Sequence, residues 1–171
     1  NNLKTAPKLV SAVFVSKSGK EGGAEDRVFG DWATDIRVAG DIEMTFTFDK
    51  AMNTSLAPEN FKVVITAGLS ELVSDSGNKW SYTWVDSRTV KVTLKQTAIN
   101  YAVDYSVKLS VSPDSYNKDT LGNVFSGYYL VDSANKYVWN FRTIGGLPVI
   151  SAPKLYNITG TTATVFFAYE M

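Results

Sequence analysis

The feature that most constrains the fold is an alternation of apolar and polar residues with a period of two. In DIEMTFTF (41–48), every second residue from Ile42 to Phe48 is apolar, and the residues between them are polar or charged. Successive side chains of a β-strand point to opposite faces, so such a segment buries one face and exposes the other. The segment therefore predicts a strand that lies over a hydrophobic core.

The same alternation recurs along most of the chain. The other segments that carry it are FKVVIT (61–66), KWSYTWV (79–85), TVKVTL (89–94), DYSVKLSV (104–111) and KYVWNFRT (136–143), and KLVSAVFV (8–15) adds one more apolar segment. Turn-forming Gly, Asp, Asn and Ser residues separate several of them, and no segment carries the apolar stripe of an amphipathic helix. About seven strands joined by turns predict an all-β fold, an Ig-like antiparallel β-sandwich.

Two long connections and one joint interrupt this rhythm. Residues 16–40 are rich in glycine and charge, and residues 112–135 form a second irregular stretch. The sequence IGGLP (144–148) combines two flexible glycines with a stiff proline, as an interdomain joint does. We therefore predict a sandwich domain over residues 1–145. Residues 146–171 are predicted to be a linker and the first strands of a following β domain, with packing back onto the first domain as the alternative.

Composition excludes several classes of function. Seventeen basic and seventeen acidic residues cancel, which argues against a nucleic-acid partner. No apolar run approaches the ~20 residues of a membrane span, so membrane insertion is not expected. The chain has no cysteine and no histidine, which removes Ser-His-Asp catalysis, cysteine nucleophiles, disulfides and the usual zinc sites. Most carboxylates fall in turns or on outward strand faces, so we predict that the chain is not an enzyme.

Five blocks occur in one order along residues 6–143. They are IEMTFTFDKAM (42–52), ENFKV (59–63), TVKVTL (89–94), DYSVKLSV (104–111), and DTLGN (119–123) followed by VWNFRT (138–143). In these blocks the chain resembles the bacterial Ig-like domain of the SbsA type, which is repeated in S-layer and other surface proteins. The two long connections depart from that pattern. The segment 147–171 resembles the start of a fibronectin type III-like domain.

The stretch FDKAMNTSLAPENF (48–61) joins two predicted strands. Phe48 ends one buried face and Phe61 begins the next, while Asp49 has a carboxylate suited to capping the turn backbone. Met52 is flexible and apolar enough to fill the end of a sandwich. The stretch is predicted to be a structural corner, and a ligand-binding loop is the alternative.

One predicted strand carries three large aromatic residues on a single face, namely Trp80, Tyr82 and Trp84. If the row is exposed, it offers a platform on which sugar rings stack. Three such side chains also bury a large apolar area when they face the opposite sheet. We predict that the row belongs to the core, with a carbohydrate-binding surface as the alternative.

Other aromatic residues lie in the irregular connections, where exposure is expected. Tyr128 and Tyr129 in the second connection, and Trp32 in the first, are the predicted contacts for a ligand or partner. An adhesive function would require the 16–40 connection to be ordered and to present Phe29 and Trp32.

Calcium is the one cofactor that this composition allows. The ion takes six to eight oxygen ligands, and Asp119 and Asn123 flank a glycine in DTLGN, with Asp114 close by in sequence. The first long connection supplies further carboxylates, Glu25, Asp26, Asp31 and Asp35. DTLGN is equally explained as a plain turn. The resemblance to S-layer domains implies calcium-dependent assembly, so Asp114, Asp119 and Asn123 are the predicted metal ligands.

Together these observations predict a non-catalytic structural or spacer module. The resemblance implies a multidomain protein at a bacterial cell surface, outside the cell. Its partners would be neighbouring domains of the same chain and further copies in an array. The alternative is a carbohydrate-binding or adhesive module attached to a surface enzyme.

Overall fold

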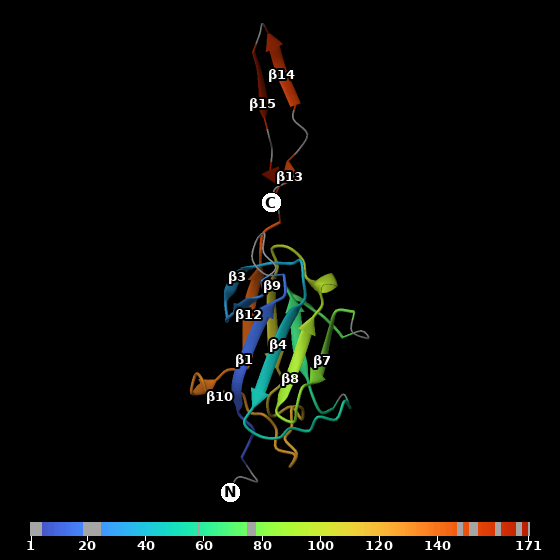
Figure 1. Cartoon of the computed structure of the whole chain (residues 1–171), viewed down its shortest axis with the longest axis vertical. Helices are drawn as coiled ribbons and strands as arrows, with labels where there is room; N and C mark the ends of the chain where they lie inside the picture. Colours follow the sequence, from blue (N-terminus) through green and yellow to red (C-terminus); the bar gives the residue numbers. More distant parts are fainter. Residues whose placement is uncertain are drawn as a thin grey trace.

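Two β-sheets packed face to face form the part of the chain between Leu9 and Thr143 in the computed structural model (Figure 1). The structure describes residues 5–18, 25–57, 59–74 and 78–146, together with the backbone of short strands beyond residue 148. Regular structure in these residues is almost entirely β-strand, joined by one turn of 3₁₀ helix, η2 (Gln96–Ala98). The predicted all-β sandwich is confirmed.

One sheet has seven strands and the other has five. The larger sheet contains β1 (Leu9–Ser16), β2 (Arg27–Phe29), β4 (Ile42–Phe48), β7 (Trp80–Trp84), β8 (Thr89–Leu94), β10 (Tyr128–Tyr129) and β11 (Ala134–Asn135). The smaller sheet contains β3 (Ala33–Ile36), β5 (Val63–Ala67), β6 (Ser70–Glu71), β9 (Asp104–Leu109) and β12 (Val138–Thr143). The spatial order is β11-β10-β1-β4-β8-β7, with β2 also pairing to β1, and β3-β12-β9-β5-β6.

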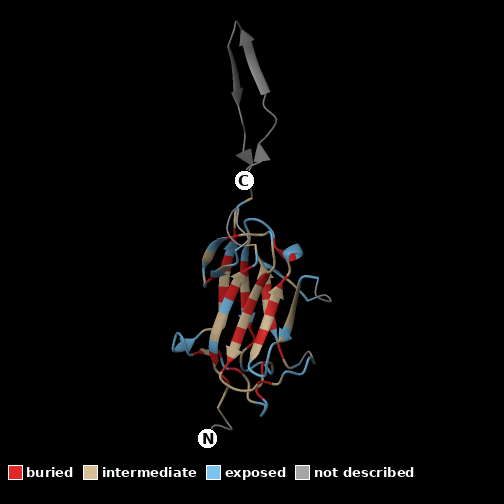
Figure 2. Ribbon diagram, viewed as in Figure 1, coloured by how far each residue is buried: buried red, intermediate tan, exposed pale blue. Residues whose placement is uncertain are grey.

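Each of the seven predicted segments overlaps one strand, and burial follows the predicted faces in β4, β5, β8, β9 and β12. In β4 the side chains of Ile42, Met44, Phe46 and Phe48 are all buried, and the intervening ones are half-buried. Figure 2 shows the resulting bands of buried and half-buried residues along the central strands. Full burial of each such side chain contributes about 1.5–3 kcal/mol, so this one strand face is a large part of what holds the sheets together.

The sheets are mixed, whereas a purely antiparallel sandwich was predicted. Two of the added strands run parallel to their neighbours: β10 pairs with β1 through Leu9 and Tyr129, and β3 pairs with β12. Both belong to the long connections, which return along sheet edges that no predicted strand occupies. They are only two to four residues long, so no alternation marks them in the sequence.

The first long connection closes one side of the sandwich. After β2 pairs with β1 in the larger sheet, the chain crosses over and forms β3 in the smaller sheet. Phe29 lies in this crossing and packs edge-on against Phe14 and Phe141, with ring centroids 5.7 and 5.3 Å apart. Residues 27–36 of the connection therefore belong to the sandwich instead of forming an irregular loop, and residues 19–24 lie outside the described residues.

The chain enters and leaves the sandwich at opposite ends (Figure 1). At the entry end the backbone N–H of Asp49 donates to the carbonyl of Lys8 at 2.9 Å. At the exit end the backbone N–H of Ala102 donates to the carbonyl of Ile144 at 2.8 Å. This arrangement determines how the domain would transmit force along the chain.

Four further strands follow the sandwich in sequence. They are β13 (Val149–Ile150), β14 (Lys154–Thr159), β15 (Thr162–Phe166) and β16 (Tyr169–Glu170). β13 pairs with β16, and β14 pairs with β15, both antiparallel. The assignment of residues 146–171 to a following domain stays a prediction.

Candidate functional site

The corner between β4 and β5 closes the entry end of the sandwich. Phe48, Met52 and Phe61 are each at most 4% exposed, as a structural corner requires. The Asp49 carboxylate does not cap its own turn: Oδ1 accepts a hydrogen bond from the backbone N–H of Lys8 at 2.8 Å. Asp49 therefore attaches the start of β1 to the end of β4.

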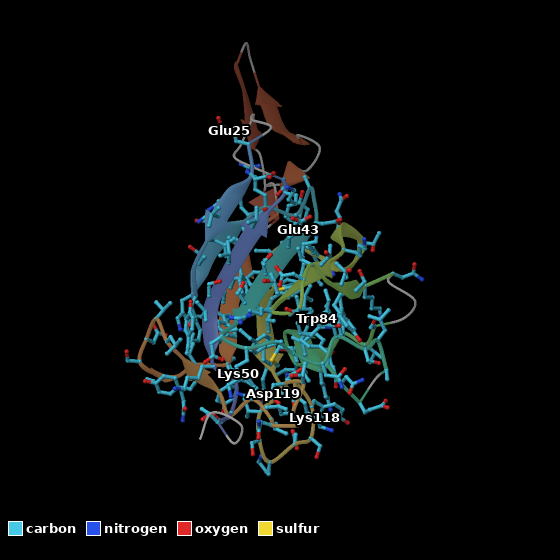
Figure 3. The ribbon with its side chains drawn as sticks, turned by 60° about the horizontal axis from the view of Figure 1, so that its bottom comes forward. Glu25, Glu43, Lys50, Trp84, Lys118 and Asp119 are labelled. Carbon is cyan, nitrogen blue, oxygen red and sulfur yellow. The ribbon has the colours of Figure 1, made fainter. Side chains whose placement is uncertain are left out.

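Asp119 is the most enclosed carboxylate at this end, with only 2% of the residue exposed. Its Oδ1 accepts hydrogen bonds from the backbone N–H groups of Leu121 and Asn123, both at 2.9 Å. Its Oδ2 accepts from Asn123 Nδ2 at 2.9 Å and lies 3.8 Å from Lys50 Nζ. Figure 3 shows Lys50 and Asp119 at the end of the molecule that is turned forward.

These contacts determine the ionisation of Asp119. Burial disfavours the charged carboxylate, but the hydrogen bonds from Asn123 and Leu121, and the charge of Lys50, outweigh it. The pKa of Asp119 is consequently lowered from its ordinary value. The ionised carboxylate of Asp119 accepts hydrogen bonds within DTLGN and so holds this turn in shape.

The same contacts bear on the predicted calcium site. The structure brings Asp119 and Asn123 together, but both oxygens of Asp119 face N–H donors. Asp114 has a different partner, because its Oδ2 lies 3.4 Å from the hydroxyl of Ser110. Across residues 5–146, wherever side chains are described, no group of three or more carboxylates is placed to hold a metal ion. In the first long connection, Asp26 forms an ion pair of 2.6 Å with Lys17. The geometry of the described residues therefore gives no support to a calcium site.

A pocket of about 470 Å³ opens beside this turn. Its lining includes the charged residues Lys8, Asp49, Lys50, Arg88 and Asp119. The cations are engaged within the protein: Lys50 donates to the carbonyl of Thr5, Arg88 donates to the carbonyl of Asp49 at 3.0 Å, and Lys8 Nζ lies 5.6 Å from the ring centroid of Tyr128. We therefore interpret the charged residues that line this pocket as structural: they hold the entry end of the sandwich together.

The aromatic row of β7 faces the inside of the sandwich. Tyr82 and Trp84 pack on Phe61, with ring centroids 4.7 and 5.8 Å apart. Trp80 donates its indole N–H to the carbonyl of Leu72 at 2.6 Å. All three of the row are half-buried against the core, so they do not form an exposed sugar platform.

Tyr129 is not an exposed contact residue, contrary to expectation. It is 8% exposed and packs against Trp139, with ring centroids 6.1 Å apart. Tyr128, its neighbour, is half-buried and faces Lys8. The pairing of β10 with β1 turns Tyr129 inward, and a two-residue strand is too short for its alternation to be recognised.

Trp32 is the predicted contact residue that the structure does expose. It is 73% exposed and has a backbone φ of 65°, in the left-handed region that bulky residues rarely occupy. Its backbone N–H donates to the carbonyl of Asn140 at 2.7 Å. The N–H of Asn140 donates in turn to Asp31 Oδ1 at 2.7 Å, and Lys136 forms an ion pair with the same carboxylate.

A pocket of about 150 Å³ lies beside Trp32 on the smaller sheet. Tyr105 and Phe141 also border it, but both are at most 2% exposed and their rings stack 5.2 Å apart in the core. Its polar lining includes Asp104 and Arg142, which form an ion pair of 3.0 Å. The exposed indole and this pocket make the best candidate site. The sequence predicts Trp32 as a contact residue, but it marks neither the pocket nor the left-handed φ, which is normally signalled by Gly or Asn.

Comparisons with protein families, with curated proteins and with solved structures find no match to this chain. No helix in the described part of the chain is both long and apolar enough to cross a bilayer.

Proposed function

We propose that this chain is a non-catalytic structural module, an Ig-like spacer of a multidomain bacterial cell-surface protein. One observation carries the proposal: neither the first nor the last long strand of the sandwich lies at a sheet edge. β1 lies between β4 and β10, and β12 lies between β9 and β3. These are the two strands that a force along the chain would pull first.

The entry strand β1 is held along its length. It pairs with β4 at seven positions, from Leu9 opposite Phe48 to Ser16 opposite Ile42. Its other edge is covered by β10 at Leu9 and by β2 from Phe14 to Ser16. Ladder hydrogen bonds run across the strands, so a force along β1 shears all of them together instead of opening them one by one.

The exit strand β12 is held in the same way. It pairs with β9 at five positions, from Val138 opposite Lys108 to Arg142 opposite Asp104. β3 covers its other edge, and the backbone N–H of Ile144 donates to the carbonyl of Ile36 at 2.8 Å. The two long connections that depart from the family pattern therefore supply the strands that enclose β1 and β12.

The remaining parts of the proposal follow from the sequence resemblance. They are an extracellular location at a bacterial surface, neighbouring domains of the same chain as partners, and self-assembly into an array. The absence of histidine and cysteine, and the engagement of Lys50, Arg88 and Asp119 in the framework, favour a non-catalytic role.

Single-molecule unfolding under force tests the proposal, and the cysteine-free chain allows unique attachment points. Handles at Thr5→Cys and Gly145→Cys pull along the strands, and position 145 has open space for a side chain. Handles at Thr5→Cys and Ser87→Cys both lie at the entry end and pull across the larger sheet. We expect a several-fold higher unfolding force in the first geometry. Equal forces, or a lower force along the strands, would reject the spacer function.

A further inference from the structure

The side chain of Trp32 lies outside the core, and its backbone has an unfavourable conformation. An indole that is 73% exposed gains little hydrophobic stabilisation, and a left-handed backbone is unfavourable for a residue with a Cβ. The conformation is nevertheless held from two sides, by the carbonyl of Asn140 and by the ion-paired carboxylate of Asp31. Strained residues that are held in place by their surroundings concentrate at ligand sites. We therefore infer that the exposed indole of Trp32 contacts a ligand.

The pocket beside the indole has the composition of a small-molecule site. Its size, about 150 Å³, suits one small ring rather than an extended chain. Trp32 and Ala33 contribute apolar surface, and Thr34, Asn140, Asp104 and Arg142 contribute polar groups. An apolar surface with a few polar groups that fix orientation is what a ligand pocket needs.

The charges around the pocket favour a neutral ligand. Arg142 Nη1 lies 3.0 Å from Asp104 Oδ2, so the two charges are already compensated. A guanidinium offers several donors and a carboxylate offers several acceptors, in adjacent positions. Neighbouring hydroxyl groups, each both donor and acceptor, match this pair better than a lone phosphate or ammonium does.

The edge of β3 argues against an extended peptide as the ligand. Strand addition would need the free backbone groups of this edge. Arg27 Nη1 donates to the carbonyls of Thr34 and Asp35, at 3.0 and 3.1 Å, and so occupies both. Both carbonyls belong to a bulge in which Thr34 and Asp35 lie between the paired positions Ala33 and Ile36. Blocking of edge groups is a recognised protection against strand addition.

We propose that Trp32 and the adjacent pocket bind a neutral saccharide. The apolar C–H face of one sugar ring stacks on the indole. The hydroxyl groups of the sugar form hydrogen bonds with Asp104, Arg142 and Asn140, which belong to the pocket lining. This site differs from the aromatic row of β7, which faces the core, and it adds a binding activity that the spacer function does not require.

Tryptophan fluorescence offers a direct test. Of the four tryptophans, Trp80 and Trp84 are half-buried and Trp139 is buried, so ligand effects at the surface report on Trp32. The probes are neutral tetrasaccharides of glucose, mannose, galactose and N-acetylglucosamine, added to the whole chain. We expect at least one to shift the emission and to protect it from acrylamide, with a dissociation constant of about 1 mM or tighter.

Two variants decide whether the effect comes from this site, with calorimetry as the readout. Trp32→Gly should abolish saccharide binding and also raise the unfolding midpoint, because glycine relieves the left-handed strain. Trp80→Phe, the matched control inside the sandwich, should leave the affinity unchanged. Binding that survives Trp32→Gly, or the absence of binding to all four probes, would overturn the proposal. Binding of a proline-rich peptide at Trp32 in place of the saccharides would also overturn it.

Discussion

The buried side-chain amide of Asn117 pairs with the backbone of Lys62 in both directions. The Lys62 N–H donates to Asn117 Oδ1 at 2.9 Å, and Asn117 Nδ2 donates to the Lys62 carbonyl at 3.0 Å. The same Nδ2 also donates to the carbonyl of Ser110 at 2.9 Å. The amide thus takes the place of a neighbouring strand and attaches the second long connection to the start of β5.

Replacing Asn117 should destabilise the domain through these lost bonds. Asn117→Ala removes the partners of the Lys62 N–H and the Ser110 carbonyl in a buried site, at about 1–3 kcal/mol for each group, while the Lys62 carbonyl keeps the backbone N–H of Ser110. We expect a loss of about 3 kcal/mol or more in the free energy of unfolding, measured by urea denaturation. Asn117→Gly should be less damaging by about 1 kcal/mol, because residue 117 has φ 55°.

The exposed Asn135→Ala is the control for this series and should change stability by less than about 0.5 kcal/mol. If Asn117→Ala is as mild as the control, the amide does not hold the connection in place.

Two tryptophans on the same face of β7 provide a matched pair. Trp80 donates its indole N–H to Leu72, whereas the buried Nε1 of Trp84 has no hydrogen-bond partner among the described residues. Trp80→Phe removes this hydrogen bond and leaves the carbonyl of Leu72 without its indole donor, whereas Trp84→Phe removes an N–H group that has no partner. The first should cost about 1 kcal/mol more than the second in urea unfolding. The reverse order would show that the indole of Trp84 is hydrogen-bonded in solution.

Acid should weaken the domain in part through Asp119. Its pKa is lowered in the folded state, so its contribution is complete above the unfolded value of about 3.9 and is lost as pH falls through the folded pKa. Asp119→Asn should be less stable near pH 7 and should show a shallower loss of stability below about pH 4. Part of the pH dependence of stability should remain in this variant, because the pKa of Asp86 is also lowered, by a hydrogen bond from the backbone N–H of Arg88. An unchanged slope would mean that Asp119 titrates normally.

Arg27 should protect the edge of β3 from self-association. Arg27→Ala exposes the carbonyls of Thr34 and Asp35, and free edge groups template pairing with another chain. Sedimentation velocity at rising concentration should reveal more associated species than in the unmodified chain. Arg27→Lys, which has one compact ammonium, should give an intermediate result. Identical sedimentation of all three proteins would refute the protective role.

The long strands were predictable because each carries enough residues for a period of two to stand out. Ile42 to Phe48 is the clearest case, and its buried face is the one that alternation predicts. The short strands β2, β3, β10 and β11 were not predictable, since two to four residues contain no measurable period. Their positions depend on pairing with strands far away in sequence, such as Tyr129 beside Leu9.

The candidate site could be predicted only in outline. Trp32 was identified as a contact residue from its place in an irregular connection, and the structure exposes it. Its partners Asp104 and Arg142 come from β9 and β12, and alternation says only that they point outward. Asp119 shows the converse limit: a carboxylate in a turn suggests a metal ligand, but in the fold its oxygens face N–H donors.

The most direct test of the spacer function is the length released in the first step when the chain is pulled between residues 5 and 145. Because β1 and β12 are enclosed on both edges, the domain should resist until it opens as a unit. We predict one step that frees the roughly 140 residues between the handles, at about 3.5 Å each. An early, small step that frees only the first or last strand would contradict the account.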